Sequence, residues 1–358
     1  MALTGRRQFL GGLLAAGLVP KPTWADAGSP AFLSAAATKG GSYVLCGIDA
    51  GLNVVFQLPL PDRGHAAAGH PSRPEAVAFA RRPGTFAVVI DCVTGRQTAV
   101  LNAPEGRHFY GHGAFSADGS LLYTTENDFE AGRGRVGVWD AASGYARIGE
   151  WDSGGIGPHD IKRLPNSDIL VVANGGIDTH PDTGRTKLNL PTMRPNLAYI
   201  DQGVVVETAE LSRDMHKNSI RHLAVSGDGT VVFGMQWQGD DTPPPLVGLH
   251  RMGGAITLPH GTDETARAMD GYIGSIAFAE NGKAIAVTSP RGGRIQVFDP
   301  ETLGLSYTKT SADVCGVAPS GRQFITTSGT GEIERLGQYA DANPRHLPLM
   351  FDNHLVSL

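Results

Sequence analysis

A unit of four short strands recurs along the chain, and this repeat limits the possible folds more than any other feature. The clearest copies are "HGAFSADGSLLYTTENDFEAGRGRVGVWDAASGYARIGEW" (112–151) and "IGSIAFAENGKAIAVTSPRGGRIQVFDPETLGLSYTKT" (273–310). Each copy reads as an apolar strand, a turn with glycine, a second strand, a loop, a third strand ending in Asp and a fourth strand. Four strands per repeat, at a period of about 40 residues, are typical of a β-propeller.

Further copies bring the count to seven. They cover 75–104, 221–258, 314–336 and a unit that opens at 160–176 and closes, after a long insertion, at 196–211. Segment 42–60 matches the second and third strands only, and "HLVSL" at the C-terminus supplies the first strand that it lacks. We therefore predict an all-β, seven-bladed β-propeller over residues 42–358, in which the C-terminal strand joins the N-terminal blade and closes the ring. A pair of β-sandwiches is the alternative, but it explains neither the period nor the orphan strand.

The composition agrees with many strands and turns and excludes some functions. The chain has 48 Gly and 23 Pro, and its net charge of −5 with 18% charged residues argues against nucleic acid as a partner. Cys46, Cys92 and Cys315 lie far apart and form no CxxC motif, which argues against thiolate zinc sites. One disulfide could form among the three cysteines, although we favour buried free thiols.

The N-terminal residues 1–27 are predicted to be an export signal. Arg6 and Arg7 are followed by Phe9, Leu10 and a mild apolar run that is too short to span a membrane, and "ADA" at 25–27 resembles a cleavage site. The paired arginines resemble a twin-arginine signal, with ordinary secretion as the alternative. This predicts a periplasmic protein with no stable membrane anchor after cleavage, and we expect residues 28–41 to be a linker.

Loop lengths distinguish the two faces of the predicted propeller. The turn after the first strand of a blade and the turn after the third lie on one face, and these turns are short, as in "SADG" and "SGDG". The other face receives the long segments 175–195, 212–220, 238–245 and 259–271, and by the same reading 69–74. Long loops on a rigid scaffold tend to carry function, so this second face is the predicted working face.

The heads of the innermost strands place a ring of polar side chains on that face. His112, His222 and Ser275 each precede the glycine of the next turn by seven residues, as the positions of Gly119, Gly229 and Gly282 show. The same register gives the full set of Glu75, His112, His159, His222, Ser275, Cys315 and His354. We predict that four imidazoles, a carboxylate and a thiol surround the mouth of the central channel.

Such a ring suits a transition metal. Imidazole binds Fe, Cu and Zn, and a nearby carboxylate or thiolate widens the choice. The alternative is that each histidine only caps its strand and bonds to backbone or water in a polar channel. No P-loop or dinucleotide motif appears in the right context, so we expect no nucleotide, and the absence of CxxCH argues against covalent haem.

A second set of residues is predicted to support the ring or a substrate. Some would come from the ends of second strands or stand beside the ring, and others would come from loops near the mouth. The set is Asp91, Glu126, Asp160, Asn174, Gln236, Ser289, Arg73, Arg194, Arg221, Met215, His216, His70, His108 and His180. The alternative for each is ordinary strand-end or loop hydrogen bonding, and no catalytic residue is assigned.

With these residues in hand, the chain resembles an uncharacterised family of twin-arginine-exported periplasmic propellers encoded beside imelysin-like and other iron-uptake proteins. The resemblance covers about residues 40–358 and rests on the segments 73–91, 111–128, 157–161, 179–201, 215–229 and 270–278. It implies a role in iron acquisition or handling, with imelysin-type proteins as partners. The chain is also distantly similar to the propeller half of nitrous oxide reductase, whose histidine ring holds a copper cluster; the full histidine set is not matched, and no cupredoxin-type domain follows.

Three functions therefore stand as hypotheses. The first is a metal-binding periplasmic propeller that serves iron or copper uptake without turnover of its own. The second is a redox enzyme or lyase that uses the bound metal. The third is a docking scaffold for partner proteins, in which the ring is purely structural.

Overall fold

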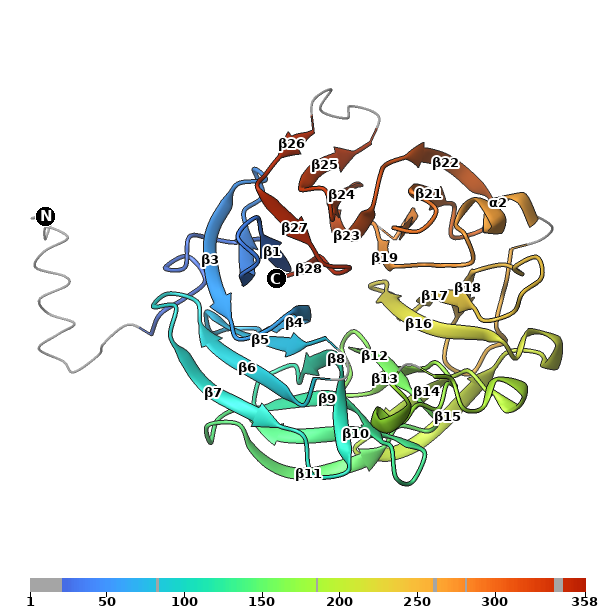
Figure 1. Ribbon diagram of the computed structural model, residues 1–358, viewed down its shortest axis with the longest axis horizontal. Helices are drawn as coiled ribbons and strands as arrows, with labels where there is room; N and C mark the ends of the chain where they lie inside the picture. The colour runs from blue at the N-terminus through green and yellow to red at the C-terminus, as the bar shows by residue number, and fades with distance from the viewer. Residues whose placement is uncertain (1–20, 82–83, 185, 260–262, 281, 338–343) are drawn as a thin grey trace, which may run out of the picture.

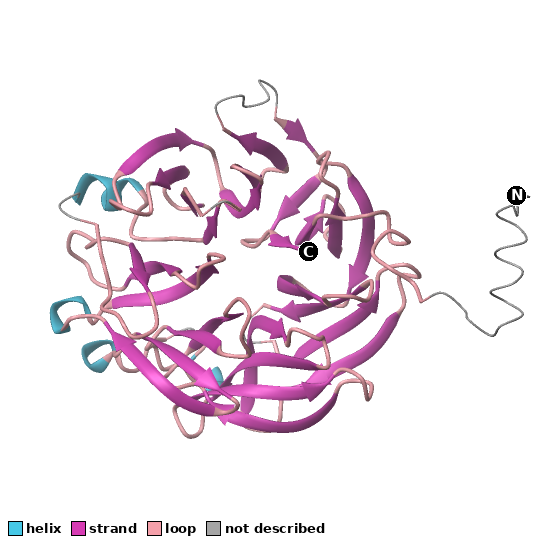
Figure 2. Cartoon of the chain, turned by 180° about the vertical axis from the view of Figure 1, so that it is seen from behind, coloured by secondary structure: helices cyan, strands magenta, loops and turns pink. Residues whose placement is uncertain are grey.

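The computed structural model describes residues 21–358 except 82–83, 185, 260–262, 281 and 338–343. Its strands form seven antiparallel sheets arranged as blades around a central axis, which confirms the predicted propeller (Figure 1). The helices of the described residues are short, and none lies at the central axis (Figure 2). They are η1 (Pro181–Thr183), η2 (Leu190–Thr192), η3 (Arg213–Met215) and α2 (Asp263–Ala268).

The first blade joins the two ends of the chain. From the axis outward it consists of β27 (Leu349–Phe351), β1 (Phe32–Thr38), β2 (Tyr43–Ile48) and β3 (Val54–Leu60), and β28 (Val356–Ser357) also pairs with β1. The register places Phe351 opposite Ala36 and Val356 opposite Leu33. Figure 1 shows the red C-terminal strands beside the blue β1, near the centre of the ring. The predicted closure of the ring is confirmed.

The other six blades follow in chain order, each starting with its innermost strand. Blade two consists of β4 (Gly64–Gly69), β5 (Glu75–Ala80), β6 (Phe86–Asp91) and β7 (Gln97–Asn102). Blade three consists of β8 (Arg107–Phe115), β9 (Leu121–Asp128), β10 (Arg133–Asp140) and β11 (Ala146–Asp152). Blade four consists of β12 (Pro158–Arg163), β13 (Leu170–Asn174), β14 (Asn196–Asp201) and β15 (Val204–Glu210). Blade five consists of β16 (Asn218–Val225), β17 (Val231–Trp237) and β18 (Val247–His250). Blade six consists of β19 (Ser275–Phe278), β20 (Ile285–Ser289), β21 (Arg294–Phe298) and β22 (Leu305–Thr310). Blade seven consists of β23 (Val314–Ser320), β24 (Gln323–Ser328), β25 (Glu332–Leu336) and β26 (Arg345–His346).

The first two blades correct the sequence-based register by one strand. Residues 28–41, expected as a linker, include β1, so that 42–60 forms the third and fourth strands of the blade. The innermost strand of blade two is likewise β4, whereas Glu75 begins the second strand, β5. Both missed strands contain a run of alanines, and β4 also has a glycine at each end, as "FLSAAAT" and "GHAAAG" show. These residues have low β-propensity, so the two strands lack the usual signal of branched and aromatic side chains.

The core consists of seven separate clusters of buried apolar side chains, one between each pair of neighbouring blades. Phe351 and Ile325 belong to the cluster between blades one and seven, and Leu45 and Val88 to the one between blades one and two. The other five clusters join the remaining neighbours in turn. Because burial of apolar surface is the main stabilising contribution, each blade depends on both of its neighbours for stability.

Residues 1–20 of the predicted export signal lie outside the described residues. The end of that segment is described and contacts the propeller. The Trp24 indole donates a hydrogen bond to the carbonyl of His70 at 3.1 Å, and Ala27 is buried in the cluster between blades one and two. Among the described helices, none is long and apolar enough to cross a membrane.

Candidate metal centre

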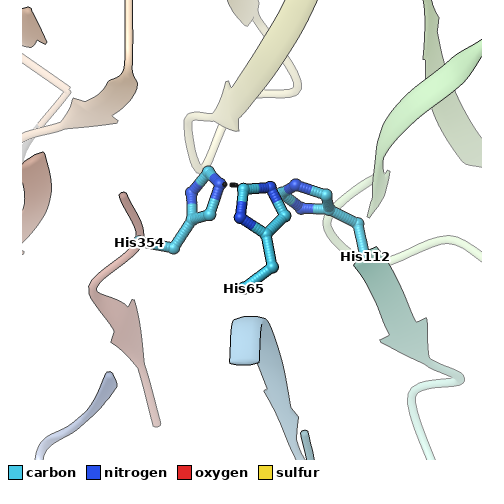
Figure 3. A group of neighbouring side chains, drawn as sticks. All are labelled: His65, His112 and His354. Atoms are coloured by element: carbon cyan, nitrogen blue, oxygen red, sulfur yellow. Dashed lines mark hydrogen bonds between the residues drawn. The ribbon is translucent and has the colours of Figure 1, made fainter. Parts of the chain in front are cut away.

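Five imidazoles, rather than four, meet at the mouth of the channel. They are His65 from β4, His112 from β8, His159 from β12, His222 from β16 and His354 from the segment between β27 and β28. Five consecutive blades thus contribute one histidine each. Neighbouring rings lie with their centroids 4.5 to 5.1 Å apart, as in the pairs His65–His354, His112–His354 and His159–His222. Figure 3 shows His65, His112 and His354 pointing toward one another from three separate segments.

Local irregularities of the innermost strands aim these side chains at the axis. Pairing with the second strand shifts register between Gly64 and Ala67, between Phe109 and Gly113, between Pro158 and Asp160, and between Ile220 and His222. Each of these bulges contains or adjoins a ring histidine. A β-bulge rotates the side chains of one strand away from regular alternation and is frequent beside functional sites. The shared irregularity explains how a repeat can present the same residue at one height in several blades.

The histidines form two overlapping groups that could each hold a metal ion. His65, His112 and His354 make one group, and His112, His159 and His222 make the other, with ligand atoms within 4.8 Å of one another in each. His112 belongs to both groups. In the first group the Nε2 atoms of His65 and His354 lie only 3.3 Å apart.

Several ring nitrogens of the second group have no hydrogen-bond partner among the described residues. They are Nε2 of His112, Nδ1 of His159 and both nitrogens of His222. The three side chains lie deep in the channel mouth, and His112 and His222 are almost completely buried. A buried polar group without a partner costs about 1 to 3 kcal/mol, so this arrangement is unfavourable unless another group satisfies these atoms.

Two buried carboxylates orient two of the rings. Asp160 Oδ1 lies 3.2 Å from Nδ1 of His112, and Asp352 Oδ1 lies 3.1 Å from Nδ1 of His65. Each contact fixes the ring and leaves its Nε2 to face the cluster. Carboxylates in this position are the usual supports of histidine ligands in metal sites.

Burial keeps the imidazoles of His65, His159, His222 and His354 neutral. It lowers the pKa of His65 to about 4, although the carboxylate of Asp352 acts in the opposite direction. Burial, followed by the neighbouring imidazoles, also lowers the pKa of His159, His222 and His354 well below the ordinary value. The neutral ring is the form of histidine that binds a metal ion.

The supporting carboxylates stay charged for a different reason. Burial raises the pKa of Asp160, but Lys162 and His112 lower it more, so the value falls below the ordinary range. Asp352 behaves in the same way, with His65 and Arg81 opposing the effect of burial. Two anionic carboxylates therefore stand behind the imidazoles of His112 and His65.

A cavity of about 770 Å³ opens above the ring on the face with the long loops. His65, His159 and His222 line its base, and segments from several blades form its walls. The long segments 175–195, 212–220, 238–245 and 259–271 all lie at loops after second strands or at links between blades, as predicted. Segment 69–74 is the exception, since it connects β4 to β5 and lies on the face with the short turns.

The other predicted ring members lie away from the imidazoles or play a different part. Glu75 contacts Arg73 and the hydroxyl of Tyr145 on the face with the short turns, so its placement at the ring was wrong. Ser275 Oγ accepts a hydrogen bond from the backbone N–H of Val317. Cys315 lines the cavity, but its thiol hydrogen-bonds to the carbonyl of Asp313, and burial raises its pKa to about 12.

Three of the predicted supporting residues lie at the ring or its cavity. Asp160 contacts His112, and Arg221 and Gln236 line the cavity wall. Gln236 also donates a hydrogen bond to the carbonyl of Ile273, and Arg221 directly precedes His222. These three placements agree with the sequence-based expectation.

The remaining supporting residues are engaged elsewhere, and most hold local structure. On the face with the short turns, His70 contacts the carbonyl of Gly119, and Asp91 accepts from the backbone of Val93 and Thr94. The others are Arg73 with Glu75, Glu126 with Arg147, Asn174 with Ser153 and Asn196, Ser289 with Met269, Arg194 with Glu210, His108 with Asn127, His180 with Asp182, His216 with Arg213, and Met215 in η3. Hydrogen bonding within loops and strand ends explains these positions.

Sequence reasoning missed His65 and Asp352. His65 escaped because its strand, β4, was not recognised, although "GHAAAG" does place a histidine at the head of an apolar stretch before a turn. Asp352 stands two residues before His354, in a segment that pairs with β1 far away in sequence. Only the closure of the ring brings Asp352 to His65, which no local pattern reveals.

Most of the chain matches one protein family. Residues 58–358 match the model of DUF1513, described as a protein of unknown function. The chain belongs to the DUF1513 family. The matched residues contain all five ring histidines and both supporting carboxylates. No curated protein matches the chain.

Among solved structures, hydrazine synthase of Kuenenia stuttgartiensis is similar in fold. The TM-score is 0.64 at 14% sequence identity, and the match covers 85% of this chain and 91% of the other. At this identity the similarity supports the propeller fold alone.

Proposed function

We propose that this DUF1513 protein binds a transition metal ion in the ring, with His112, His159 and His222 as ligands. The observation that carries the proposal is the set of buried, unsatisfied ring nitrogens on these three residues. A metal ion would coordinate one nitrogen of each ring and remove much of the cost of leaving them without partners. The carboxylate of Asp160 behind His112 gives the site the support expected of a metal ligand.

The ligand atoms of the site narrow the choice of metal ion. Three imidazoles without a carboxylate or thiolate suit iron, copper or zinc, and disfavour magnesium and calcium, which prefer oxygen. We propose that the protein serves the acquisition or handling of iron or copper in the periplasm. The paired Arg6 and Arg7 support export by the twin-arginine route, and the resemblance to propellers encoded near imelysin-type proteins supports a role beside such partners.

Elemental analysis tests the metal site directly. Protein purified from the periplasm, or reconstituted with Fe(II), Cu(II) or Zn(II) and passed over a desalting column, is expected to hold about one equivalent of metal per chain. The double substitution His112→Ala and His222→Ala should abolish retention. The matched control is His216→Ala with His346→Ala, which removes two histidines that lie outside both groups. Retention below about 0.1 equivalent in the unaltered protein, unchanged by the double substitution, would exclude the site.

One observation favours a second candidate function, a metal-dependent redox enzyme or lyase. Three protein ligands leave coordination positions open, and the cavity of about 770 Å³ lies directly over His159 and His222. Catalytic metals keep such an open position, whereas purely structural ones do not. Azide added to the Cu(II)-loaded protein should then shift the visible absorption spectrum. An unchanged spectrum at saturating azide would favour binding without turnover.

A further inference from the structure

The wall of the cavity above the ring is strongly cationic. Five positively charged side chains line it against two carboxylates, although the whole chain carries a net charge of −5. The cations are Arg63, Arg81, Lys187, Arg221 and Arg291, and the carboxylates are Asp313 and Asp352. A cavity lined by one sign of charge concentrates ligands of the opposite sign.

Two of the five cations are already matched. Arg63 and Arg81 both contact the carboxylate of Asp352, at 2.8 Å and 2.9 Å. Of the other three, Lys187 and Arg291 have no carboxylate partner among the described residues, and they come from the segment after β13 and from the loop after β20.

Lys187 is close enough to the other two cations to be affected by their charge. No carboxylate of the described residues lies within salt-bridge distance of Lys187 or Arg291, and Asp240 is the acidic residue whose charge acts on Lys187. Partial burial, and then the charges of Arg221 and Arg291, lower the pKa of Lys187. Like charges gathered at a cavity without a matching carboxylate are unfavourable until an anion joins them.

Two further features fit a bound ligand. Thr179 lines the cavity and is only 3% exposed, yet its Oγ1 has no hydrogen-bond partner among the described residues. The guanidinium of Arg291 lies over the ring of Tyr272, 4.5 Å from its centroid, which holds this charge in place at the cavity wall. A hydroxyl without a partner and an oriented arginine are donors ready for an anionic group.

We propose that the cavity binds a small organic anion carrying two or three negative groups, held by Lys187 and Arg291 in the wall that also carries Arg221, with a hydrogen bond from Thr179. The size of the cavity lies within the usual range for small-molecule sites, and several separated cations match several separated anionic groups better than one. The anion site shares its cavity with the ring, but it stands whether or not the ring holds a metal ion.

Calorimetric titration of chelator-treated, metal-free protein tests the proposal. Citrate and inorganic pyrophosphate are the multivalent probes, and acetate is the monovalent one. We expect at least one multivalent probe to bind, acetate to bind far more weakly, and the affinity to fall as salt increases. A preference for citrate identifies a carboxylate ligand, and a preference for pyrophosphate identifies a phosphate ligand.

Substitutions locate the binding. Lys187→Gln and Arg291→Gln should each weaken binding of the preferred probe about tenfold or more, since each removes a charge-assisted hydrogen bond to the anion. Both residues are exposed, so the variants should fold. The matched control is Arg194→Gln, which removes an exposed arginine paired with Glu210 outside the cavity and should have no effect.

These experiments test the metal site and the anion site independently of each other. His112→Ala with His222→Ala should abolish metal retention and leave anion binding to the metal-free protein intact. If no multivalent anion binds, or if Lys187→Gln and Arg291→Gln behave like the Arg194→Gln control, the anion site is excluded whatever the metal content.

Discussion

Asp160 Oδ1 lies 3.2 Å from Nδ1 of His112, and this single carboxylate joins three blades. Its other oxygen accepts a hydrogen bond from the backbone N–H of Leu223 in blade five at 3.0 Å, while its own blade supplies the N–H of Ile161. The residue that orients a ring histidine thus also fixes the positions of the strands that carry the other ligands. Metal affinity and blade packing should therefore change together when Asp160 is altered.

Replacement of Asp160 by Asn tests this coupling. The amide keeps one acceptor oxygen but loses the charge that supports His112, so we expect metal affinity to fall about 10- to 100-fold. Unfolding in urea should show a smaller loss of stability than for Asp160→Ala, which leaves the N–H of Leu223 without an acceptor. Competition with a chromophoric chelator measures the affinity.

Asp313→Asn is the matched control, because Asp313 lines the same cavity but contacts Cys315 rather than a ring histidine. An unchanged metal affinity in Asp160→Asn would contradict the supporting role of the carboxylate.

Gly111 is the residue that allows His65 and His112 to approach each other. Its φ is +98°, and a Cβ at this position would lie 2.7 Å from Cδ2 of His65. Gly111→Ala should therefore strain the backbone and displace the imidazole of His65. We expect a loss of stability of about 1 to 3 kcal/mol for the backbone conformation, with a further loss from the steric clash.

Gly229→Ala separates these two contributions, since its φ is +84° but nothing lies within 4 Å of the added Cβ. Thermal unfolding of both variants provides the comparison. Equal losses of stability would mean that the contact of residue 111 with His65 carries no cost.

Most of the fold could be predicted from the repeat, because each blade repeats the same alternation of apolar strands and tight turns. His112, His159 and His222 were found together because their strands keep a constant distance from the next turn. These histidines are not close to one another in the sequence, and only the alignment of the repeated strands brings them together. The prediction failed where the strands themselves are weak, in the alanine-rich β1 and β4, and this failure placed Glu75 where His65 lies.

The supporting contacts could not be predicted in the same way. Asp352 reaches His65 only because β27 pairs with β1, a contact between opposite ends of the chain. Glu126 was expected to support the ring because it lies near the end of a second strand. Its side chain is instead buried and pairs with Arg147, so that it bridges β9 and β11. Strand-end position gives the face of the propeller, but the direction of a long side chain depends on its packing neighbours.

The closure of the ring by β27 predicts where the propeller is most sensitive to truncation of side chains. Phe351 is buried in the cluster between blades one and seven, whereas its neighbour Met350 is 46% exposed. Phe351→Ala should cost about 3 to 5 kcal/mol of unfolding free energy, and Met350→Ala should cost much less. Urea unfolding followed by tryptophan fluorescence measures both; similar costs would show that β27 does not contribute to the core as described.

The repeated turn after the innermost strand predicts a pH dependence of stability. In "SADGS" the carboxylate of Asp118 accepts hydrogen bonds from Ser116 and Ser120, and these bonds lower its pKa to about 2. A carboxyl whose pKa is lower in the folded chain stabilises the fold above its ordinary pKa, and this contribution is lost as pH falls through about 2. Asp118→Ala should therefore lower the Tm at pH 7, and the deficit relative to the unaltered protein should narrow between pH 4 and pH 2. Calorimetry across this range gives the answer, and a deficit of constant size would show that the charge of Asp118 contributes nothing to the turn.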